Sequence, residues 1–301
     1  MAMDLGFLGL GHMGGAIAER LLGHDDQLHV FDPAEPTLAR FRDLGAIVQA
    51  SPVAVAAVAP IVFACLPEPS VSDRVADQIA AAPGALRIYV EMSTIGRRTM
   101  SGIAERLGAR GVTVVDCPVS GGPAGARAGT LATMAAGPRA ALDELRPLLA
   151  RIGSSPFEIG ETPGLGQMMK LVNNLMAIAN QTIAFEALVL GAKGGLDPDL
   201  MVEVVNRSTG RSVATEGIVP RAVLTGSFDF GARLAVPYKD LALGLAEAEA
   251  LGVPMWTAET ARQVWRFALS QGMGEDDYST LIKLMERWAG AEVRGSKAER
   301  D

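Results

Sequence analysis

The 301-residue sequence predicts an α/β domain with a doubly wound, mainly parallel sheet, followed by an all-α domain. Short, almost wholly apolar segments alternate with helical patterns over the first half of the chain, which is typical of parallel strands buried on both faces. From Gly164 the pattern changes to almost continuous helix, interrupted by glycine and proline turns. Because the chain exceeds what one core usually supports, we expect two domains, at 1–163 and 164–301.

The expected elements follow from apolar periodicity and turn residues. In the first domain, strands are predicted at 5–10, 27–31, 46–48, 61–66, 87–91, 112–115 and 129–137, and helices at 16–22, 40–44, 52–58, 70–82, 97–110 and 138–152. In the second domain, helices are predicted at 164–195, 197–206, 221–224, 239–251, 257–271 and 279–288. The helix at 164–195 is long enough to join the two domains.

The composition narrows the classes of partner. A net charge of −7 argues against a general binder of nucleic acid or of acidic membranes, so we expect a small-molecule or protein partner. The N-terminus lacks a basic leader, and no apolar run reaches roughly 18 residues without Gly, Pro or charge, so neither a secretory signal nor a membrane span is expected. Cys65 and Cys117 imply no disulfide framework and favour the reducing cytosol. His12, His24 and His29 lack metal-ligand spacing, so no metal is expected.

A glycine-rich turn follows the first predicted strand and precedes a helical pattern. It consists of Gly9, Leu10, Gly11, His12, Met13 and Gly14. In such a turn Gly9 permits the tight bend, Gly11 lets a pyrophosphate approach the backbone, and Gly14 lets helix and strand pack closely. The phosphate would lie at the helix N-terminus, where N–H groups and the helix dipole favour an anion. This context predicts a Rossmann dinucleotide-binding domain.

An acidic residue ends the second predicted strand. Asp32 stands where a carboxylate meets the adenosine ribose, and it would accept hydrogen bonds from both ribose hydroxyls and repel a 2′-phosphate. NAD is therefore favoured over NADP. The alternative, a glycine turn without nucleotide and an aspartate that caps a helix, is disfavoured by the combination. Leu66, Pro67 and Thr94 follow later strands at the edge where the dinucleotide would cross, although ordinary turn chemistry explains Pro67 or Thr94 equally well.

Two further segments carry polar groups suited to a substrate. Ser120, Gly121 and Gly122 place two glycines after a serine hydroxyl, which exposes backbone N–H groups that can hold a carboxylate. A glycine hinge is the alternative for this segment. Lys239 is expected to begin a helix after a break at Pro237, and its side chain faces either solvent or the same site.

The predicted helix 164–195 carries one polar stripe. At 100° per residue Lys170, Asn173, Asn174 and Gln181 project within about 60° of one direction, and most of the remaining surface is apolar. A helix that is apolar nearly all round is buried, and a buried lysine must be paired or have its pKa lowered. A lysine that snorkels to solvent is the alternative.

The motifs occur in an order that resembles the β-hydroxyacid dehydrogenase family, which includes 3-hydroxyisobutyrate dehydrogenase and tartronate semialdehyde reductase. The shared blocks are Gly6–Gly14, Glu91–Ile95, Asp116–Gly122, Gly166–Asn174 and Lys239–Leu241. The resemblance extends from Gly6 to about Met285, and five blocks in family order are far more specific than one.

The resemblance implies a role for each motif. Lys170 would be the catalytic lysine and Asn174 a substrate-orienting amide one turn further on. Ser120, Gly121 and Gly122 would hold the substrate carboxylate, and Thr94 and Lys239 would lie on the nicotinamide side. Relatives form dimers or tetramers through the α domain, so a homodimer or homotetramer is expected.

The implied reaction is NAD-dependent interconversion of a small β-hydroxyacid and its semialdehyde or keto acid. Hydride leaves the hydroxyl-bearing carbon for the nicotinamide while Lys170 takes the hydroxyl proton, and reduction runs in reverse. Because a free lysine with a pKa of about 10.4 is a poor base at neutral pH, burial, with a contribution from Lys239, is expected to lower the pKa of Lys170.

Departures from related families limit the function. Decarboxylating 6-phosphogluconate dehydrogenases carry His three residues after the lysine and Glu seven after it, where this chain has Asn173 and Ala177. Enzyme-assisted decarboxylation is therefore not expected. Imine reductases share the architecture but generally replace the lysine. An imine or oxime reductase and a non-catalytic NAD-binding scaffold or sensor remain the alternatives.

Several residues have no assigned role. Arg211, Ser212 and Phe230, with Lys239, are candidates for the substrate-selecting pocket wall in the α domain. Cys117 stands where relatives often have alanine. Gln181 is expected to make a structural hydrogen bond within the α domain.

Overall fold

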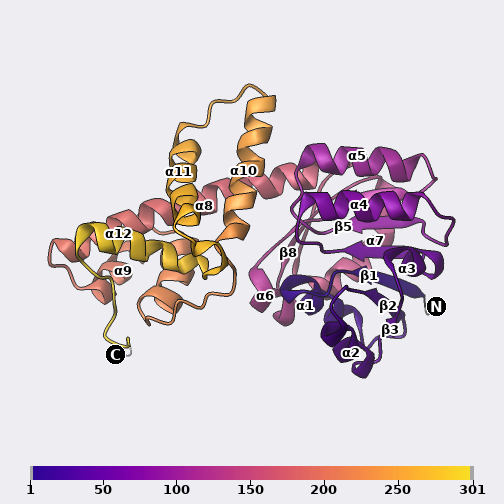
Figure 1. The fold of residues 1–301 in the computed structure, drawn as a ribbon, viewed down its shortest axis with the longest axis horizontal. Helices are drawn as coiled ribbons and strands as arrows, with labels where there is room; N and C mark the ends of the chain where they lie inside the picture. The colour runs from indigo at the N-terminus through magenta and orange to yellow at the C-terminus, as the bar shows by residue number, and fades with distance from the viewer. Residues whose placement is uncertain (1–2, 299–301) are drawn as a thin grey trace. The chain divides into compact units, whose positions relative to one another are not determined.

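The computed structural model describes residues 3–298, which form two compact units, Met1–Lys170 and Leu171–Asp301 (Figure 1). The first unit is built on a mainly parallel sheet and the second is helical, as predicted. The predicted boundary at 163/164 lies at the start of helix α8 (Leu165–Lys193), whereas the division between the compact units lies within α8, after Lys170.

The first unit contains a nine-stranded sheet with the order β3-β2-β1-β4-β5-β6-β8-β7, and β9 pairs with β8. The strands are β1 (Asp4–Leu8), β2 (Gln27–Phe31), β3 (Ile47–Val48), β4 (Ile61–Ala64), β5 (Ile88–Glu91), β6 (Thr113–Asp116), β7 (Val119–Ser120), β8 (Ala132–Ala136) and β9 (Ser155–Gly160). Strands β1 to β6 pair in parallel, while β8 is antiparallel to β6 and β7 and parallel to β9. The order 3-2-1-4-5-6 is that of a doubly wound Rossmann sheet, which confirms the predicted fold class.

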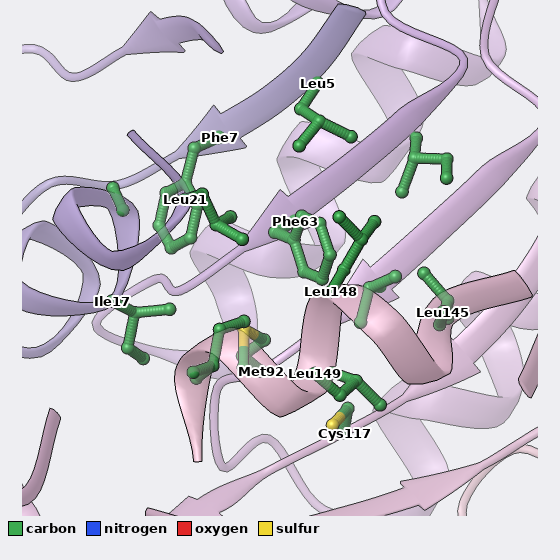
Figure 2. Close-up of a cluster of buried hydrophobic side chains, with 14 of the residues drawn as sticks. Leu5, Phe7, Ile17, Leu21, Phe63, Met92, Cys117, Leu145, Leu148 and Leu149 are labelled. Atoms are coloured by element: carbon green, nitrogen blue, oxygen red, sulfur yellow. The ribbon is translucent and has the colours of Figure 1, made fainter. Parts of the chain in front are cut away.

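Helices cover both faces of this sheet. They are α1 (His12–Leu21), α2 (Glu35–Asp43), α6 (Gly122–Ala128) and α7 (Arg139–Ile152) with one core cluster, and α3 (Pro52–Val58), α4 (Pro69–Ala80) and α5 (Arg97–Gly108) with the other. Along β4, Ile61 and Phe63 belong to the first cluster and Val62 and Ala64 to the second, because successive side chains of a strand point to opposite faces. Figure 2 shows the first cluster, where α7 packs on the sheet.

Three elements of the first unit were not predicted from the sequence. Helix α6 contains two glycines, β7 has two residues, and β9 is largely exposed and contains Pro156, so none has the apolar period that marks an element. Two predicted helices begin earlier than expected. Helix α1 starts at His12, directly after the glycine turn, and α2 starts at Glu35.

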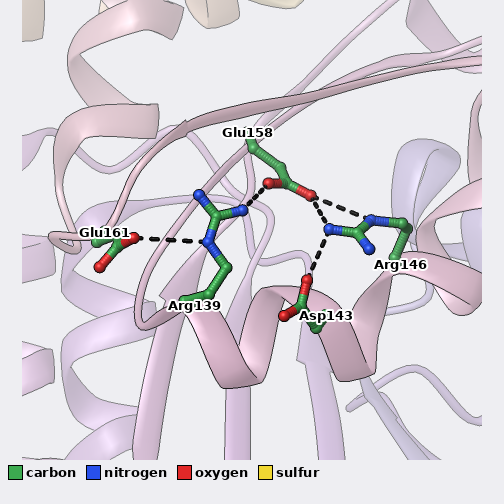
Figure 3. A network of polar contacts seen from close by, with 5 residues as sticks. All are labelled: Arg139, Asp143, Arg146, Glu158 and Glu161. Carbon is green, nitrogen blue, oxygen red and sulfur yellow. Dashed lines mark hydrogen bonds and ion pairs between the residues drawn. The ribbon is translucent and has the colours of Figure 1, made fainter.

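An exposed network of charged side chains connects α7 with β9 (Figure 3). Glu158 of β9 accepts hydrogen bonds from Arg139 and from Arg146, the latter at 2.6 Å. Arg146 also pairs with Asp143 at 2.7 Å, and Arg139 with Glu161 at 3.5 Å. These hydrogen bonds lower the pKa of Glu158. Exposed ion pairs contribute little individually, but here several converge on the strand that leads into α8.

All the named elements in the described part of the second unit are helical, and an isolated bridge pairs Arg233 with Asp277. After α8 it contains α9 (Pro198–Asn206), a π-helix η1 (Ala214–Val223), α10 (Ala235–Ala250), α11 (Trp256–Ser270), the 3-10 turns η2 (Met273–Glu275) and η3 (Tyr278–Thr280), and α12 (Leu281–Ala289). The helix predicted at 221–224 is the end of the longer η1. The expectation that Lys239 begins a helix is wrong, because α10 begins at Ala235 and Pro237 lies in its first turn, where proline is tolerated.

Helix α8 differs from the sequence-based expectation about membrane spans. Its length and its mean hydropathy of 1.5 over the most apolar window meet the criteria for a membrane-crossing helix, and 33% of that window is buried within the structure. A long core helix of a two-domain protein meets the same criteria. The charged residue Lys170, one of the interruptions that argued against a span, lies in α8, but it does not remove the apolar composition of the helix.

Candidate active site

The site residues predicted in the first unit gather at one edge of the sheet. The glycine turn follows β1, Asp32 follows β2, Leu66 and Pro67 follow β4, and Thr94 follows β5. Because parallel strands end at the same edge, these segments face a common region, which is where ligands bind on such sheets. The Ser120 segment begins after β6 and belongs to the same end of the sheet.

The glycine turn has the geometry of an anion site. Gly9 has φ of 87°, and a Cβ on Gly14 would lie 2.0 Å from the carbonyl oxygen of Gly9. No heavy atom lies within 4 Å of a Cβ built on Gly11, so the backbone is open there. Helix α1 starts at the next residue with no side-chain cap and no acidic residue in its first turn. Its first N–H groups therefore point toward a region suited to a phosphate.

Asp32 is fixed beside this turn by two backbone donors. Its Oδ2 accepts a hydrogen bond from the N–H of Leu10 at 2.7 Å, and its Oδ1 accepts one from Ala34 at 2.8 Å. Each carboxylate oxygen has a further lone pair, so both can accept a hydroxyl hydrogen bond. The turn and the carboxylate thus fit the pyrophosphate and the ribose of a dinucleotide.

The start of α8 is bonded to the end of β6. Asp116, which is fully buried, accepts hydrogen bonds from the N–H groups of Gly164 at 2.8 Å and Gln167 at 2.7 Å. Burial raises the pKa of Asp116 to about 6, although these hydrogen bonds act in the opposite direction. A Cβ on Gly166 would lie 2.3 Å from the carbonyl oxygen of Met134, so the first turn of α8 rests directly on the β6 and β8 backbone.

Gln167 connects the same turn to the segment after β5. Its Oε1 accepts hydrogen bonds from the N–H groups of Ile95 at 2.9 Å and Gly96 at 3.1 Å, and its Nε2 donates to the carbonyl oxygen of Ser93 at 2.9 Å. Thr94 lies within this bonded segment. Lys170 follows Gln167 by about one helical turn and is 8% exposed.

A buried carboxyl at the end of β5 is hydrogen-bonded to the segment Ser93–Gly96 that follows this strand. Glu91 accepts hydrogen bonds from the N–H of Ser93 at 2.9 Å and from the hydroxyl of Tyr89 at 3.2 Å. The hydroxyl of Ser93 in turn accepts from the N–H of Leu66 at 2.6 Å. Burial raises the pKa of Glu91 to about 7, and the hydrogen bonds from Ser93 and Tyr89 moderate the rise. The ends of β4 and β5 are therefore tied to each other as well as to α8.

The carboxyl of Glu91 makes stability depend on pH. In the unfolded chain its pKa is near 4.5, and in the folded state about 7, so folding takes up a proton between these values. Glu91 alone should lower the free energy of unfolding by about 1.4 kcal/mol per pH unit as pH rises from 5 to 7, and Asp116, whose pKa is also raised, adds to this fall up to about pH 6. Urea unfolding measured across this range tests the sign. Glu91→Gln should remove this part of the slope, and a slope unchanged in that variant would contradict the assignment.

In the second unit, the amide of Asn174 is held by two neighbours. Its Nδ2 donates to Oδ2 of Asp240 at 2.6 Å, and its Oδ1 accepts from Nδ2 of Asn173 at 3.0 Å. Lys239 lies 3.2 Å from Oδ1 of Asp240, and its side chain is 25% exposed. The sequence indicated Asn174 and Lys239 but not Asp240, which connects them. One N–H of the Asn174 amide is left for a further acceptor.

The remaining candidates of the second unit have structural partners or face solvent. Gln181 is 2% exposed and donates to the carbonyl oxygen of Tyr278 at 3.3 Å, which confirms the predicted structural hydrogen bond. Phe230 packs edge-on against Tyr278 and beneath the guanidinium of Arg221. Arg211 is exposed, and Ser212 accepts a hydrogen bond from Thr215 through its carbonyl oxygen.

The thiol of Cys117 lies in the core of the first unit. Cys117 is fully buried, and burial raises the pKa of its thiol to about 12, so it stays protonated. Nothing in the structure explains why cysteine stands at this position. Across residues 3–298, no three His, Cys, Asp or Glu side chains are grouped so as to hold a metal ion.

Comparison with known proteins gives matches over both units. Residues 4–160 match the model of the NAD binding domain of 6-phosphogluconate dehydrogenase, and residues 164–285 match that of the NAD-binding domain of NADP-dependent 3-hydroxyisobutyrate dehydrogenase. The 2-(hydroxymethyl)glutarate dehydrogenase of Eubacterium barkeri is 33% identical over 98% of this chain and 99% of its own. The NAD-dependent L-serine dehydrogenase of Pseudomonas aeruginosa is 33% identical over 95% and 99%.

A solved structure has a similar fold. The 3-hydroxyisobutyrate dehydrogenase of Mycobacterium tuberculosis, determined with L-serine, aligns with a TM-score of 0.85 at 28% identity over 95% of this chain and 99% of its own. Its likeness extends over nearly the whole chain, as do the sequence matches above. The protein is therefore an oxidoreductase of the β-hydroxyacid dehydrogenase family.

Proposed function

We propose that this protein interconverts a small β-hydroxyacid and its semialdehyde or keto acid with NAD, and that Lys170 is the general acid and base. The observation that carries the proposal is the attachment of the α8 first turn to the ends of β5 and β6 through Gln167 and Asp116. This attachment supports the proposal, because Lys170 is largely buried and follows by one turn the residues bonded to the strand ends where a dinucleotide would bind.

The choice of NAD rests on Asp32. Its two carboxylate oxygens are oriented by Leu10 and Ala34 and would accept the two ribose hydroxyls, while a 2′-phosphate would meet a negative charge. The L-serine dehydrogenase relative is named as NAD-dependent, whereas the family model of residues 164–285 is named for an NADP-dependent enzyme. We therefore favour NAD on the ground of Asp32 itself.

The residues of this chain would divide the work of the reaction. The turn Gly9 to Gly14 would hold the pyrophosphate. Leu66 and Pro67 would lie where the dinucleotide crosses the sheet edge, and Thr94 and Lys239 would lie on the nicotinamide side. Ser120, Gly121 and Gly122 would hold the substrate carboxylate, and Gly121 and Gly122 have φ of 132° and 65°, which allow their N–H groups to converge. Asn174 would donate its remaining N–H to the substrate.

When bound, NAD supplies the hydride acceptor. The protein itself would transfer the proton of the substrate hydroxyl. Lys170 would remove this proton during oxidation and return it during reduction. Asn173 and Ala177 stand where decarboxylating relatives have His and Glu, so the reaction should end at the carbonyl product with its carboxylate intact.

A panel of substrates tests the proposal. NAD reduction is measured with 3-hydroxyisobutyrate, L-serine, glycerate, 3-hydroxypropionate, 4-hydroxybutyrate and threonate, and each assay is repeated with NADP. At least one hydroxyacid should be oxidised, with kcat/KM higher for NAD than for NADP. No turnover on any member combined with tight NAD binding would instead support a scaffold or sensor, and a preference for NADP would contradict the role of Asp32. Cyclic imines with NADPH, run in parallel, test the imine reductase alternative.

We also propose a homodimer or homotetramer that associates through the second unit. Met176, Ile183 and Leu190 are 63%, 59% and 74% exposed, and their seven-residue spacing places them on one face of α8. An exposed apolar stripe of this kind is typical of an interface. A single-chain mass in sedimentation equilibrium would contradict this assembly.

We further propose that the protein works in the reducing cytosol. The two free thiols, Cys65 and Cys117, accord with this proposal.

A further inference from the structure

The side chain of Gln167, one helical turn before Lys170, makes three hydrogen bonds. It is completely buried, its oxygen accepts from the N–H groups of Ile95 and Gly96, and its nitrogen donates to Ser93. Fixing a glutamine side chain in one rotamer costs conformational entropy, and a buried amide needs hydrogen-bond partners. The three partners therefore hold this side chain in place. All three partners belong to the single segment that follows β5.

Gln167 is also the point where two loop systems meet. Its backbone N–H donates to Asp116 at 2.7 Å, which leads to the Ser120 loop, and its side chain holds Ser93, whose hydroxyl accepts from Leu66 at 2.6 Å. A continuous set of hydrogen bonds thus runs from the end of β4, through β5, to the start of α8 and the end of β6. Every member of the set lies in the first unit.

The spacing along α8 brings this set to the proposed acid and base. Residues three apart on a helix lie on adjacent positions of one face, with Cβ atoms about 5–6 Å apart, so Gln167 and Lys170 share a face. Thr94 lies between Ser93 and Ile95, the two residues that Gln167 holds from either side. A shift in this contact would change the position of Lys170 relative to the nicotinamide side of the site.

We propose that Gln167 is a positioning residue, which sets the distance between Lys170 on α8 and the cofactor-facing segment Ser93–Gly96. This inference rests on the proposed function, because it assigns Gln167 a role in the alignment of proton transfer with hydride transfer. Gln167 itself is not expected to touch the substrate. Its effect is on the rate of the chemical step, since misplacement of a reacting group by about 1 Å can cost about 100-fold in rate.

The first test replaces Gln167 with methionine, which has a similar length and no hydrogen-bonding amide. With the panel hydroxyacid of highest kcat/KM, kcat of Gln167→Met should fall by about 10- to 100-fold. The dissociation constant of NAD, measured by fluorescence titration, should change less than about twofold, since the glycine turn and Asp32 are unaltered. A kcat within twofold of the natural enzyme, in a variant that binds NAD, would overturn the proposal.

The second test uses Gln167→Glu, whose protonated carboxyl reproduces the donor and acceptor of the amide. When protonated, one oxygen accepts from Ile95 and Gly96 and the hydroxyl donates to Ser93. When ionised, the side chain has no donor and faces the carbonyl of Ser93, with Asp116 and Glu91 nearby and Lys170 one turn away. The ratio of kcat in Gln167→Glu to kcat in the natural enzyme should therefore rise as pH falls. Taking the ratio removes the titrations that are the same in both enzymes, and the pH profile of kcat/KM of each enzyme shows whether the new carboxyl has shifted the pKa of Lys170.

This second variant keeps the proposal testable if the methionine variant does not fold, because the acceptor for the two N–H groups is retained. A merely structural role would lower the melting temperature but leave the kcat ratio constant with pH. A constant ratio below one would therefore overturn the proposal, as would a ratio near one at every pH.

A matched control loses a buried polar contact of the same unit far from the site. Asp26 accepts hydrogen bonds from Met3 at 3.1 Å and from Arg151 at 2.7 Å, before the amino end of β2 and so at the opposite edge of the sheet. Asp26→Asn should lower the melting temperature and keep kcat within twofold. Failure of the natural enzyme on the whole panel would refute the proposed function, whereas an active natural enzyme with unaffected Gln167 variants refutes only the positioning role.

Discussion

Replacing Lys170 with alanine is expected to lower kcat by about 10²- to 10⁴-fold and to leave the dissociation constant of NAD nearly unchanged. The reason is that the residues proposed to bind NAD and the residue proposed to transfer the proton lie at different strands of the sheet. Asp32 and the glycine turn lie after β1 and β2, whereas Lys170 lies on α8, which is bonded to the ends of β5 and β6. Steady-state kinetics with a hydroxyacid of the panel and fluorescence titration with NAD measure the two effects separately.

Two further substitutions distinguish proton transfer from packing. Lys170→Met keeps most of the length and removes the ammonium, and Lys170→Arg keeps the charge but does not release its proton near neutral pH. Both should be as slow as Lys170→Ala. Lys193→Ala, at the exposed end of the same helix, serves as the control and should retain full activity. Turnover of Lys170→Ala equal to that of the natural enzyme would refute the catalytic assignment.

The sequence predicted the parts of the fold that depend on local pattern. Apolar strands such as Ile61–Ala64 stand between helical segments, and a parallel sheet covered on both faces follows from that alternation. The glycine turn was predictable for the same reason, because strand, Gly9 and helix are consecutive. The order of the strands follows the general rule for doubly wound sheets rather than any single residue.

The contacts that hold the site together were not predictable in this way. Asp116 and Gln167 are separated by about 50 residues, and Gln167 and Ser93 by more than 70, so no local period links them. Asp116, Gln167 and Ser93 all lie within the shared family blocks, and this is the signal that the sequence offered for them. Asp240 was missed similarly, since its bond to Asn174 spans 66 residues.

The predicted bounds of several helices were wrong where a glycine or a proline interrupts the apolar periodicity of the helix. Helix α6 begins at Gly122, α10 contains Pro237 in its first turn, and η1 contains Pro220 in an unusual π-helical segment. Each of these helices therefore includes a glycine or a proline that local pattern treats as a stop. A prediction that ends every helix at a glycine or a proline therefore gives the wrong bounds for these helices.

The substitution Gly166→Ala is expected to lower the free energy of unfolding of the protein by about 3 kcal/mol. A Cβ at this position would lie 2.3 Å from the carbonyl oxygen of Met134 and 2.8 Å from Oδ2 of Asp116. Neither atom is the end of a flexible side chain that could move aside, because Asp116 is fixed by its two bonds to the α8 first turn. The helical preference of alanine over glycine, about 1 kcal/mol, is too small to offset the clash.

Activity should fall along with stability in Gly166→Ala, because the first turn of α8 must move and carries Gln167 and Lys170 with it. Gly102→Ala on α5 is the matched control, since the nearest atom to its Cβ is the flexible end of Arg106 at 3.4 Å. That variant should be as stable as the natural protein or slightly more so, and fully active. Equal stability of the two variants in urea unfolding would contradict the close contact of α8 with the β6 and β8 backbone, and the positions of Gln167 and Lys170 would need another cause.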